Sequence, residues 1–278
     1  MLKIPLFFNK FRSRIDVWQR LVFASVALAL VYFWYSGMML HHVWDSPFNY
    51  KGADISYWLY SSTKLTKIIL ASEQSALVFS FILIGLFIAN VIWVKQPLLS
   101  ILAGVCLLIY QIQFNMKIGY HTHHLFGFQF ALFPFYVPQV TFPAALALAR
   151  ILTCLAYFFA GFFKLYHGAW LYIDSYANVL KNQHAAWYYF HQTGWRTDAT
   201  LYMIEHPMLG WGLFMSAMLM QLSFAVGLIT KRFNVWLALG IVLFHIMDWF
   251  LMNLGVFMGM TVLVWLLLYQ APKSAEKC

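Results

Sequence analysis

The chain has 278 residues, of which 63% are hydrophobic, 20% aromatic and 10% charged. Soluble globular domains carry roughly a quarter charged residues, so this composition excludes an ordinary soluble domain and indicates an integral membrane protein. The formal net charge is +9. Its cations lie mostly in short segments beside apolar runs, which favours topology signals over nucleic-acid binding. The three cysteines are scattered, and they predict neither a disulfide framework nor a zinc site.

The apolar runs predict an all-α fold, a polytopic bundle of about eight transmembrane helices with interfacial helices on the outer side. The expected fourth span is short and is broken by Pro134 and Pro138, so it is either a kinked span or partly re-entrant. The expected spans cover residues 21–40, 75–94, 98–114, 123–137, 143–164, 208–230, 234–252 and 255–270.

We expect a cytoplasmic interfacial segment over residues 1–20, a single transmembrane domain over 21–270 and a cytoplasmic tail over 271–278. The first segment mixes cations with large apolar residues, which is typical of a helix lying on an anionic membrane surface. The first span resembles a retained anchor rather than a cleaved signal. With both termini inside, the positive-inside rule is satisfied by Lys3, Lys10, Arg12, Arg14, Arg20, Lys95, Lys231, Arg232, Lys273 and Lys277.

The expected fifth span carries Arg150 and Lys164, two cations that a lipid-facing helix should not contain. They are 14 residues apart, which at about 100° per residue places them within roughly 40° of each other on the helix surface. Thr153, Tyr157 and Ala160 fall between them on the same stripe. Such a stripe should face protein or water rather than lipid.

Lys164 follows the small residues Ala160 and Gly161, which allow a neighbouring helix to approach closely. A lysine held in that place would be desolvated, and desolvation favours the free amine, which is a base near neutral pH. The alternative is a lysine that extends from the helix end to the membrane interface. For Arg150 we favour an interfacial anchor or a structural partner for helix carbonyls over a catalytic role.

His245 and Asp248 lie three residues apart in the expected seventh span and therefore share a helical face. A carboxylate in the membrane needs a partner, which is either His245 or Lys164. The two partners have opposite consequences. A carboxylate orients an imidazole, whereas an ion-paired Lys164 is a poor base until Asp248 is neutralised or moves.

His121, His123 and His124 form a cluster before the expected fourth span. No carboxylate or cysteine accompanies them at a set spacing, so a wet loop or a proton-transfer group is favoured over a metal site, and no metal is expected. The chain has no Gly-rich phosphate loop, no nucleophile elbow and no HExxH motif, so hydrolase and nucleotide-binding functions lack support.

Two blocks of the sequence resemble the membrane domain of vitamin K-dependent gamma-carboxylases and their bacterial relatives, the horizontally transferred transmembrane domain (HTTM) family. The remaining spans are similar to that family in order and hydropathy only, over about residues 21–270. The first block comprises Arg150, Tyr157, Phe158, Ala160, Gly161, Lys164, Leu165 and Trp170, and the second comprises Phe244, His245, Met247, Asn253, Gly255 and Phe257.

The resemblance implies a carboxylase- or oxygenase-like enzyme, a lyase or oxidoreductase, in which Lys164 deprotonates a vitamin K-like hydroquinone. Oxygenation of the resulting anion would then make the strong base that acts on a substrate glutamate. By the same resemblance, His245 and either His121 or His123 would position the reacting oxygen or relay protons. The pocket would include Tyr157, Gly161, Asp248 and Asn253.

Two features depart from the family pattern. Asp248 stands where the carboxylases carry asparagine, which bears on the state of Lys164, and the large extramembrane part that holds the peptide substrate has no counterpart here, which weighs against protein carboxylation. We therefore expect a bacterial inner-membrane enzyme acting on a quinol or similar lipid-soluble substrate, with membrane lipids, a quinone and a peptide as candidate partners. The alternatives are a non-catalytic membrane partner in peptide or toxin maturation or export, and a quinone-binding redox subunit without its own chemistry.

Overall fold

The computed structural model describes residues 14–47, 60–118, 125–181, 194–252 and 261–269. All regular structure within these ranges is helical, as the sequence predicts. Also within them, five helices are long and apolar enough to cross a membrane, which is compatible with a multi-pass membrane protein. They cover Ile15–Val43, Glu73–Ile92, Pro97–Lys117, Phe142–Tyr166 and Pro207–Ile229. The predicted all-α membrane helix bundle is thus confirmed. The boundaries 1–20, 21–270 and 271–278 stay a prediction.

Helix α2 (Ile15–Tyr35) begins earlier than the expected first span, which starts at Leu21. Asp16 lies in its first turn, where a carboxylate interacts favourably with the helix dipole, and it also pairs with Arg14 at 2.6 Å. The helix therefore includes six positions that hydropathy assigned to the preceding surface segment. It ends at Tyr35 with Ser36 as the C-cap, and Gly37 follows with a φ of +72°, a backbone conformation that glycine adopts without steric cost.

The described parts of the expected fourth and eighth spans are short. Helix α8 (Leu125–Leu132) has eight residues, or about 12 Å, against a hydrocarbon core of about 30 Å. The 3-10 turn η2 (Phe133–Phe135) follows it and contains Pro134. For the eighth span, the described residues form η4 (Thr261–Leu263) and α15 (Val264–Leu268).

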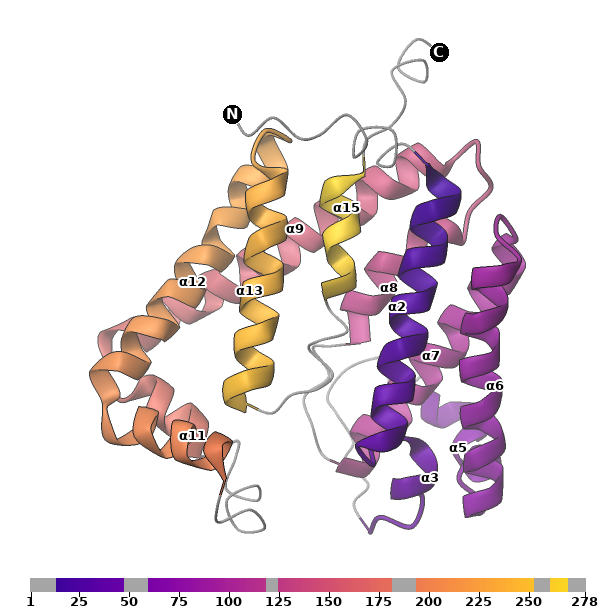
Figure 1. The fold of residues 1–278 in the computed structure, drawn as a ribbon, viewed down its shortest axis with the longest axis horizontal. Helices are drawn as coiled ribbons and strands as arrows, with labels where there is room; N and C mark the ends of the chain where they lie inside the picture. Colours follow the sequence, from indigo (N-terminus) through magenta and orange to yellow (C-terminus); the bar gives the residue numbers. More distant parts are fainter. Residues whose placement is uncertain (1–13, 48–59, 119–124, 182–193, 253–260, 270–278) are drawn as a thin grey trace. The chain divides into compact units, whose positions relative to one another are not determined.

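Contacts divide the chain into two units, the first made of Met1–Ala149 with Leu268–Cys278 and the second of Arg150–Leu267. In the first unit α2 lies beside α6 (Glu73–Ile92), and α6 lies beside α7 (Pro97–Ile118) (Figure 1). The short helices α3 (Leu40–Val43) and α5 (Leu65–Ile69) pack against α6. The outer face of α6 exposes apolar side chains suited to lipid, namely Val78, Phe81, Ile82, Ile88 and Ile92.

Aromatic packing and buried polar bonds hold the first unit together. Phe23 of α2 packs on Phe87 of α6 with ring centroids 5.4 Å apart. Between α6 and α7, the hydroxyl of Ser100 donates to Asn90 Oδ1 at 2.7 Å, and Asn90 Nδ2 donates to Leu99 O at 3.2 Å. Because water is absent from the hydrocarbon core, such polar groups must find partners inside the protein.

Gly104 allows α7 to meet the segment that follows α8. A Cβ at this position would lie 1.9 Å from Tyr136 Oη, so a larger residue would displace that hydroxyl. Tyr136 Oη donates to Gln129 Oε1 at 2.8 Å, and Gln129 Nε2 donates to Gly104 O at 3.0 Å. The absence of a side chain at Gly104 therefore leaves room for the Tyr136 hydroxyl and its hydrogen bond to Gln129, which in turn bonds to the Gly104 carbonyl.

The second unit contains the later part of α9 (Phe142–Tyr166) together with α12 (Pro207–Ile229) and α13 (Asn234–Met252). Helix α11 (Trp195–Glu205) contacts both α12 and α13 (Figure 1). Helices α9 and α12 meet at two glycines. A Cβ on Gly227 would lie 2.8 Å from Cys154 Sγ, and one on Gly161 would lie 2.9 Å from the backbone nitrogen of Leu222.

Arg150 joins three elements of the second unit through one buried guanidinium. It is 9% exposed, and its Nη2 donates to Gly227 O, to Thr230 O at 3.3 Å and to Asn234 Oδ1 at 3.1 Å. Asn234 Nδ2 in turn donates to Leu267 O at 2.9 Å. The carbonyls belong to the C-terminal end of α12, where the helix dipole is negative. Of the two structural roles expected for Arg150, the partner for helix carbonyls is confirmed.

We predict that Arg150→Lys lowers the free energy of unfolding by about 1–3 kcal/mol, because the lysine side chain is shorter and its nitrogen does not reach the position from which Arg150 Nη2 donates to these acceptors. The measurement is a denaturant titration of the protein in mild detergent, followed by far-UV circular dichroism. The matched control is Arg232→Lys, since Arg232 is exposed. Equal unfolding midpoints for the two variants would contradict the structural role.

Candidate functional site

The buried stripe of α9 is the starting point of the site. Thr153 and Tyr157 are buried, and Lys164 is partly buried, so most of the predicted polar stripe faces protein. The exception is Ala160, which is exposed. Gly161, one position and about 100° further round the helix, is buried in its place. Of the two small residues expected to allow a neighbouring helix to approach, Gly161 is the one that makes the close contact.

The amine of Lys164 is held by side chains from two other helices. Its Nζ donates to Gln221 Oε1 of α12 at 2.8 Å. It also lies 5.6 Å from the ring centroid of Phe214 and 5.7 Å from that of Phe244, within the range of cation–π attraction. Lys164 is therefore directed at α12 and α13 and not at the membrane interface, in contrast to the alternative of an extended lysine.

Asp248 of α13 is the acidic group of this cluster. It interacts electrostatically with Lys164, and its Oδ2 lies 4.0 Å from Nδ1 of His245. Both partners considered from the sequence are thus near the carboxylate. The i, i+3 spacing on one helix brings His245 to it, and the packing of α9 brings Lys164.

His245 connects the carboxylate to Tyr157. Its Nε2 is hydrogen-bonded to the hydroxyl of Tyr157, and the imidazole is 4% exposed. The tyrosine ring is fixed by stacking on Phe224, with centroids 4.6 Å apart and ring planes 19° apart. A carboxylate beside Nδ1 favours the tautomer that carries its proton there, so that Nε2 accepts and Tyr157 donates.

The site therefore contains two acid–base groups that share one carboxylate. The first is the Lys164 amine with the amide of Gln221. The second is the series Tyr157, His245 and Asp248. A proton taken up by one group changes the charge beside the other, because interactions between charges are strong where water is scarce. Such an arrangement is suited to proton transfer.

Four predicted site residues are thus brought together on α9 and α13, and Gly161 provides the contact with α12. His121, His123, His124 and Asn253 lie outside the described residues, so their predicted roles stay predictions. Within the part of the chain that the structure describes, no group of three histidine, cysteine or acidic residues is placed to hold a metal ion.

Sequence reasoning missed Gln221, the hydrogen-bond partner of Lys164. A signal was available, since Gln221 is an amide in the middle of an apolar run, where an unpartnered polar group is costly. It is 4% exposed. An isolated amide has no periodic companion, however, and only the α9–α12 contact at Gly161 shows which residue it serves.

No protein-family model matches the chain, and no match was found among curated proteins or among solved structures.

We predict that Gly161→Ala separates α9 from α12 and lowers the free energy of unfolding by about 1–3 kcal/mol. The added methyl would lie 2.9 Å from a backbone atom and 3.0 Å from Gln221 Cβ, so the helix itself must move, and with it the partner of Lys164. The control is Gly212→Ala in α12, where the new methyl would meet nothing within 4 Å. The two variants should differ in detergent-based unfolding experiments, and equal stability would refute the close contact.

Proposed function

We propose that this protein is a multi-pass membrane enzyme in which Lys164 acts as general base toward a quinol, or a similar lipid-soluble substrate with an acidic hydroxyl. The observation that carries the proposal is the environment of the lysine amine. The amine donates a hydrogen bond to Gln221 at 2.8 Å, is flanked by two phenylalanine rings and lies near Asp248. A lysine that only neutralised lipid phosphate would not require these partners.

The proposed step is a proton transfer. The substrate hydroxyl gives its proton to the neutral amine of Lys164, which leaves a substrate oxyanion and an ammonium. Gln221 Oε1 accepts a hydrogen bond from the nitrogen and so orients its lone pair, while Asp248 stabilises the ammonium as it forms. The flanking rings of Phe214 and Phe244 supply apolar surroundings, in which the neutral amine is favoured before the transfer.

The second acid–base group would return the site to its starting state. Tyr157 is hydrogen-bonded to His245, and Asp248 Oδ2 lies 4.0 Å from His245 Nδ1, so a small movement of the carboxylate toward the imidazole would complete a proton route along three side chains. In this proposal His245 is a positioning and relay residue rather than the primary base. Whether His121 or His123 also takes part depends on a segment outside the described residues.

The resemblance to the HTTM family supports the same assignment, because Lys164 and His245 match the residues that implied quinol chemistry. The reduced quinone and the bacterial inner membrane, with both termini cytoplasmic, are part of the proposal. So is a downstream peptide modification. The non-catalytic alternative requires a different property of Lys164. A docking surface needs the positive charge of the side chain, whereas the enzyme needs its free amine.

We predict that Lys164→Ala reduces turnover of a reduced naphthoquinone by about 100-fold or more, the range attributed to a general base, without loss of the folded protein. The protein is reconstituted in nanodiscs and mixed with the quinol. Formation of the quinolate is followed by absorbance, and its faster reaction with oxygen is followed by an oxygen electrode. Size-exclusion elution and circular dichroism control for folding. Turnover at the level of the unsubstituted protein would end the proposal.

Lys164→Arg separates the catalytic function from the non-catalytic one. Arginine keeps the positive charge but does not supply a neutral nitrogen, so the proposed enzyme should lose activity in this variant as it does in Lys164→Ala. A docking or export partner should tolerate it. Activity retained in Lys164→Arg and lost in Lys164→Ala would assign the charge, and not the base, as the functional feature.

We also predict that Tyr157→Phe lowers turnover by roughly 10-fold or more, because it removes the hydroxyl that bonds to His245 while it keeps the ring that stacks on Phe224. Its effect should fall on kcat more than on KM, since quinol binding does not depend on the relay. The control is Tyr166→Phe, which removes an exposed hydroxyl on the same helix. Equal kcat values in the two variants would remove Tyr157 from the mechanism.

A further inference from the structure

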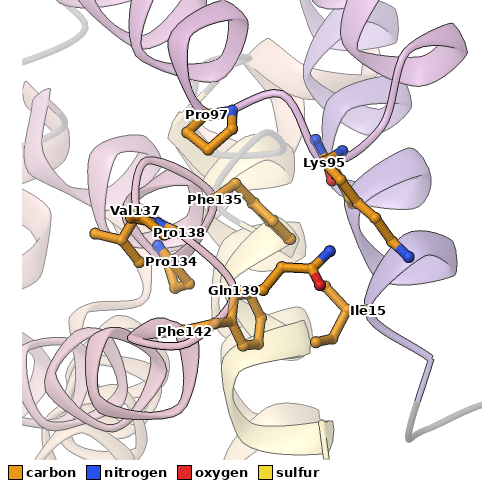
Figure 2. Close-up of a pocket in the computed structure, with 10 residues that line it drawn as sticks. Ile15, Lys95, Pro97, Pro134, Phe135, Val137, Pro138, Gln139 and Phe142 are labelled. Atoms are coloured by element: carbon orange, nitrogen blue, oxygen red, sulfur yellow. Dashed lines mark hydrogen bonds between the residues drawn. The ribbon is translucent and has the colours of Figure 1, made fainter.

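A pocket of about 270 Å³ lies in the first unit, where the ends of four helices meet. Three separate segments form it: the start of α2, the α6–α7 turn, and the link from α8 to α9 (Figure 2). The volume is just below the range of ligand pockets, roughly 300–1,000 Å³. The lining residues are Ile15, Gln19, Lys95, Pro97, Pro134, Phe135, Val137, Pro138, Gln139 and Phe142.

Hydrogen bonding and aromatic packing of the lining residues fix the walls of this pocket. Gln19 Oε1 accepts a hydrogen bond from the backbone N–H of Lys95 at 3.0 Å, which ties the α6–α7 turn to α2. Phe135 packs on Phe23 and on Phe142, each with ring centroids 5.8 Å apart. Phe142 packs in turn on Tyr269, also at 5.8 Å. The pocket is therefore preformed and does not depend on a ligand for its shape.

Its lining is apolar at the base and polar at the rim. Pro134, Phe135 and Phe142 are buried, whereas Lys95 and Gln139 are exposed. Among the described lining residues, Lys95 has the only charged side chain, and no described acidic residue pairs with it. A ligand that fits this pocket carries a negative charge, hydrogen-bond acceptors and an apolar body.

We propose that the pocket binds the headgroup of an anionic phospholipid. The phosphodiester would lie at Lys95 and Gln139, with the glycerol and the first methylenes over Phe135 and Phe142. Four candidate spans begin or end here, so the pocket lies at the depth of the lipid headgroups, and the charge distribution of the chain assigns this end to the cytoplasmic leaflet, where anionic lipids attract basic residues. A soluble phosphate would gain nothing from the aromatic base.

The test uses detergent-purified full-length protein, titrated with dioctanoyl phosphatidylglycerol and followed by native mass spectrometry. We expect phosphatidylglycerol to bind at least about fivefold more tightly than dioctanoyl phosphatidylcholine, since one lysine near a membrane surface contributes about that factor. Lys95→Gln should weaken phosphatidylglycerol binding by a similar factor. Lys95→Arg should retain it, and so should the control Lys231→Gln, in which an exposed lysine of another turn is changed.

Three results would overturn the proposal. The first is equal binding of phosphatidylcholine, which would indicate apolar adhesion without charge recognition. The second is binding of glycerol 3-phosphate as tight as that of phosphatidylglycerol, which would assign the site to a soluble anion. The third is unchanged binding in Lys95→Gln. Should that variant fail to elute as folded protein, Gln139→Leu provides the same test at the other side of the rim, with weaker phosphatidylglycerol binding as the expected result.

Discussion

The structure depends on one constraint, which is that a polar group in an apolar helix must find its partner inside the protein. Lys164 is the clearest case. Its amine obtains a hydrogen bond from α12 and an opposite charge from α13, and neither is available on its own helix. Since lipid offers no hydrogen bonds, the packing of α9 on α12 has to bring Gln221 to this nitrogen, and Asp248 of α13 lies near enough to interact with it electrostatically.

The same constraint explains why cations of similar sequence context have different roles. Arg150 and Lys164 share one face of α9, yet Arg150 meets the carbonyls at the end of α12 and Lys164 meets side chains. Carbonyls at a helix end provide a fixed partial negative charge, which suits a permanent guanidinium. A carboxylate and an amide allow the charge to change. The helix therefore carries one cation suited to structure and another suited to chemistry.

The sequence was sufficient for features that depend on a single helix. A cation in an apolar run is a strong signal, and helical spacing correctly placed Arg150, Tyr157 and Lys164 on the buried side of α9. The sequence was insufficient where the position of a residue depends on contact with a second helix. Which small residue faces α12 required a helix rotation known to better than one position, and Gln221 could be assigned only from a contact 57 positions away in sequence. Helix α2 begins six residues before the expected span for a different reason, since hydropathy marks the apolar stretch and not the full length of the helix.

Glycine links the packing of the second unit to its chemistry. At Gly161 the close approach of α9 and α12 leaves no room for a methyl group, and Gln221 lies directly at that contact, with its Cβ 3.0 Å from the position that a side chain on Gly161 would take. Gly161, which permits the helix contact, and Gln221, which holds the amine, therefore lie at the same place in the interface. A helix interface that merely needed stability could use many combinations of small and large side chains. This interface also fixes the distance between an amine and an amide on different helices, and the contacts of 2.9 and 3.0 Å that a Cβ would make are what favour glycine at position 161.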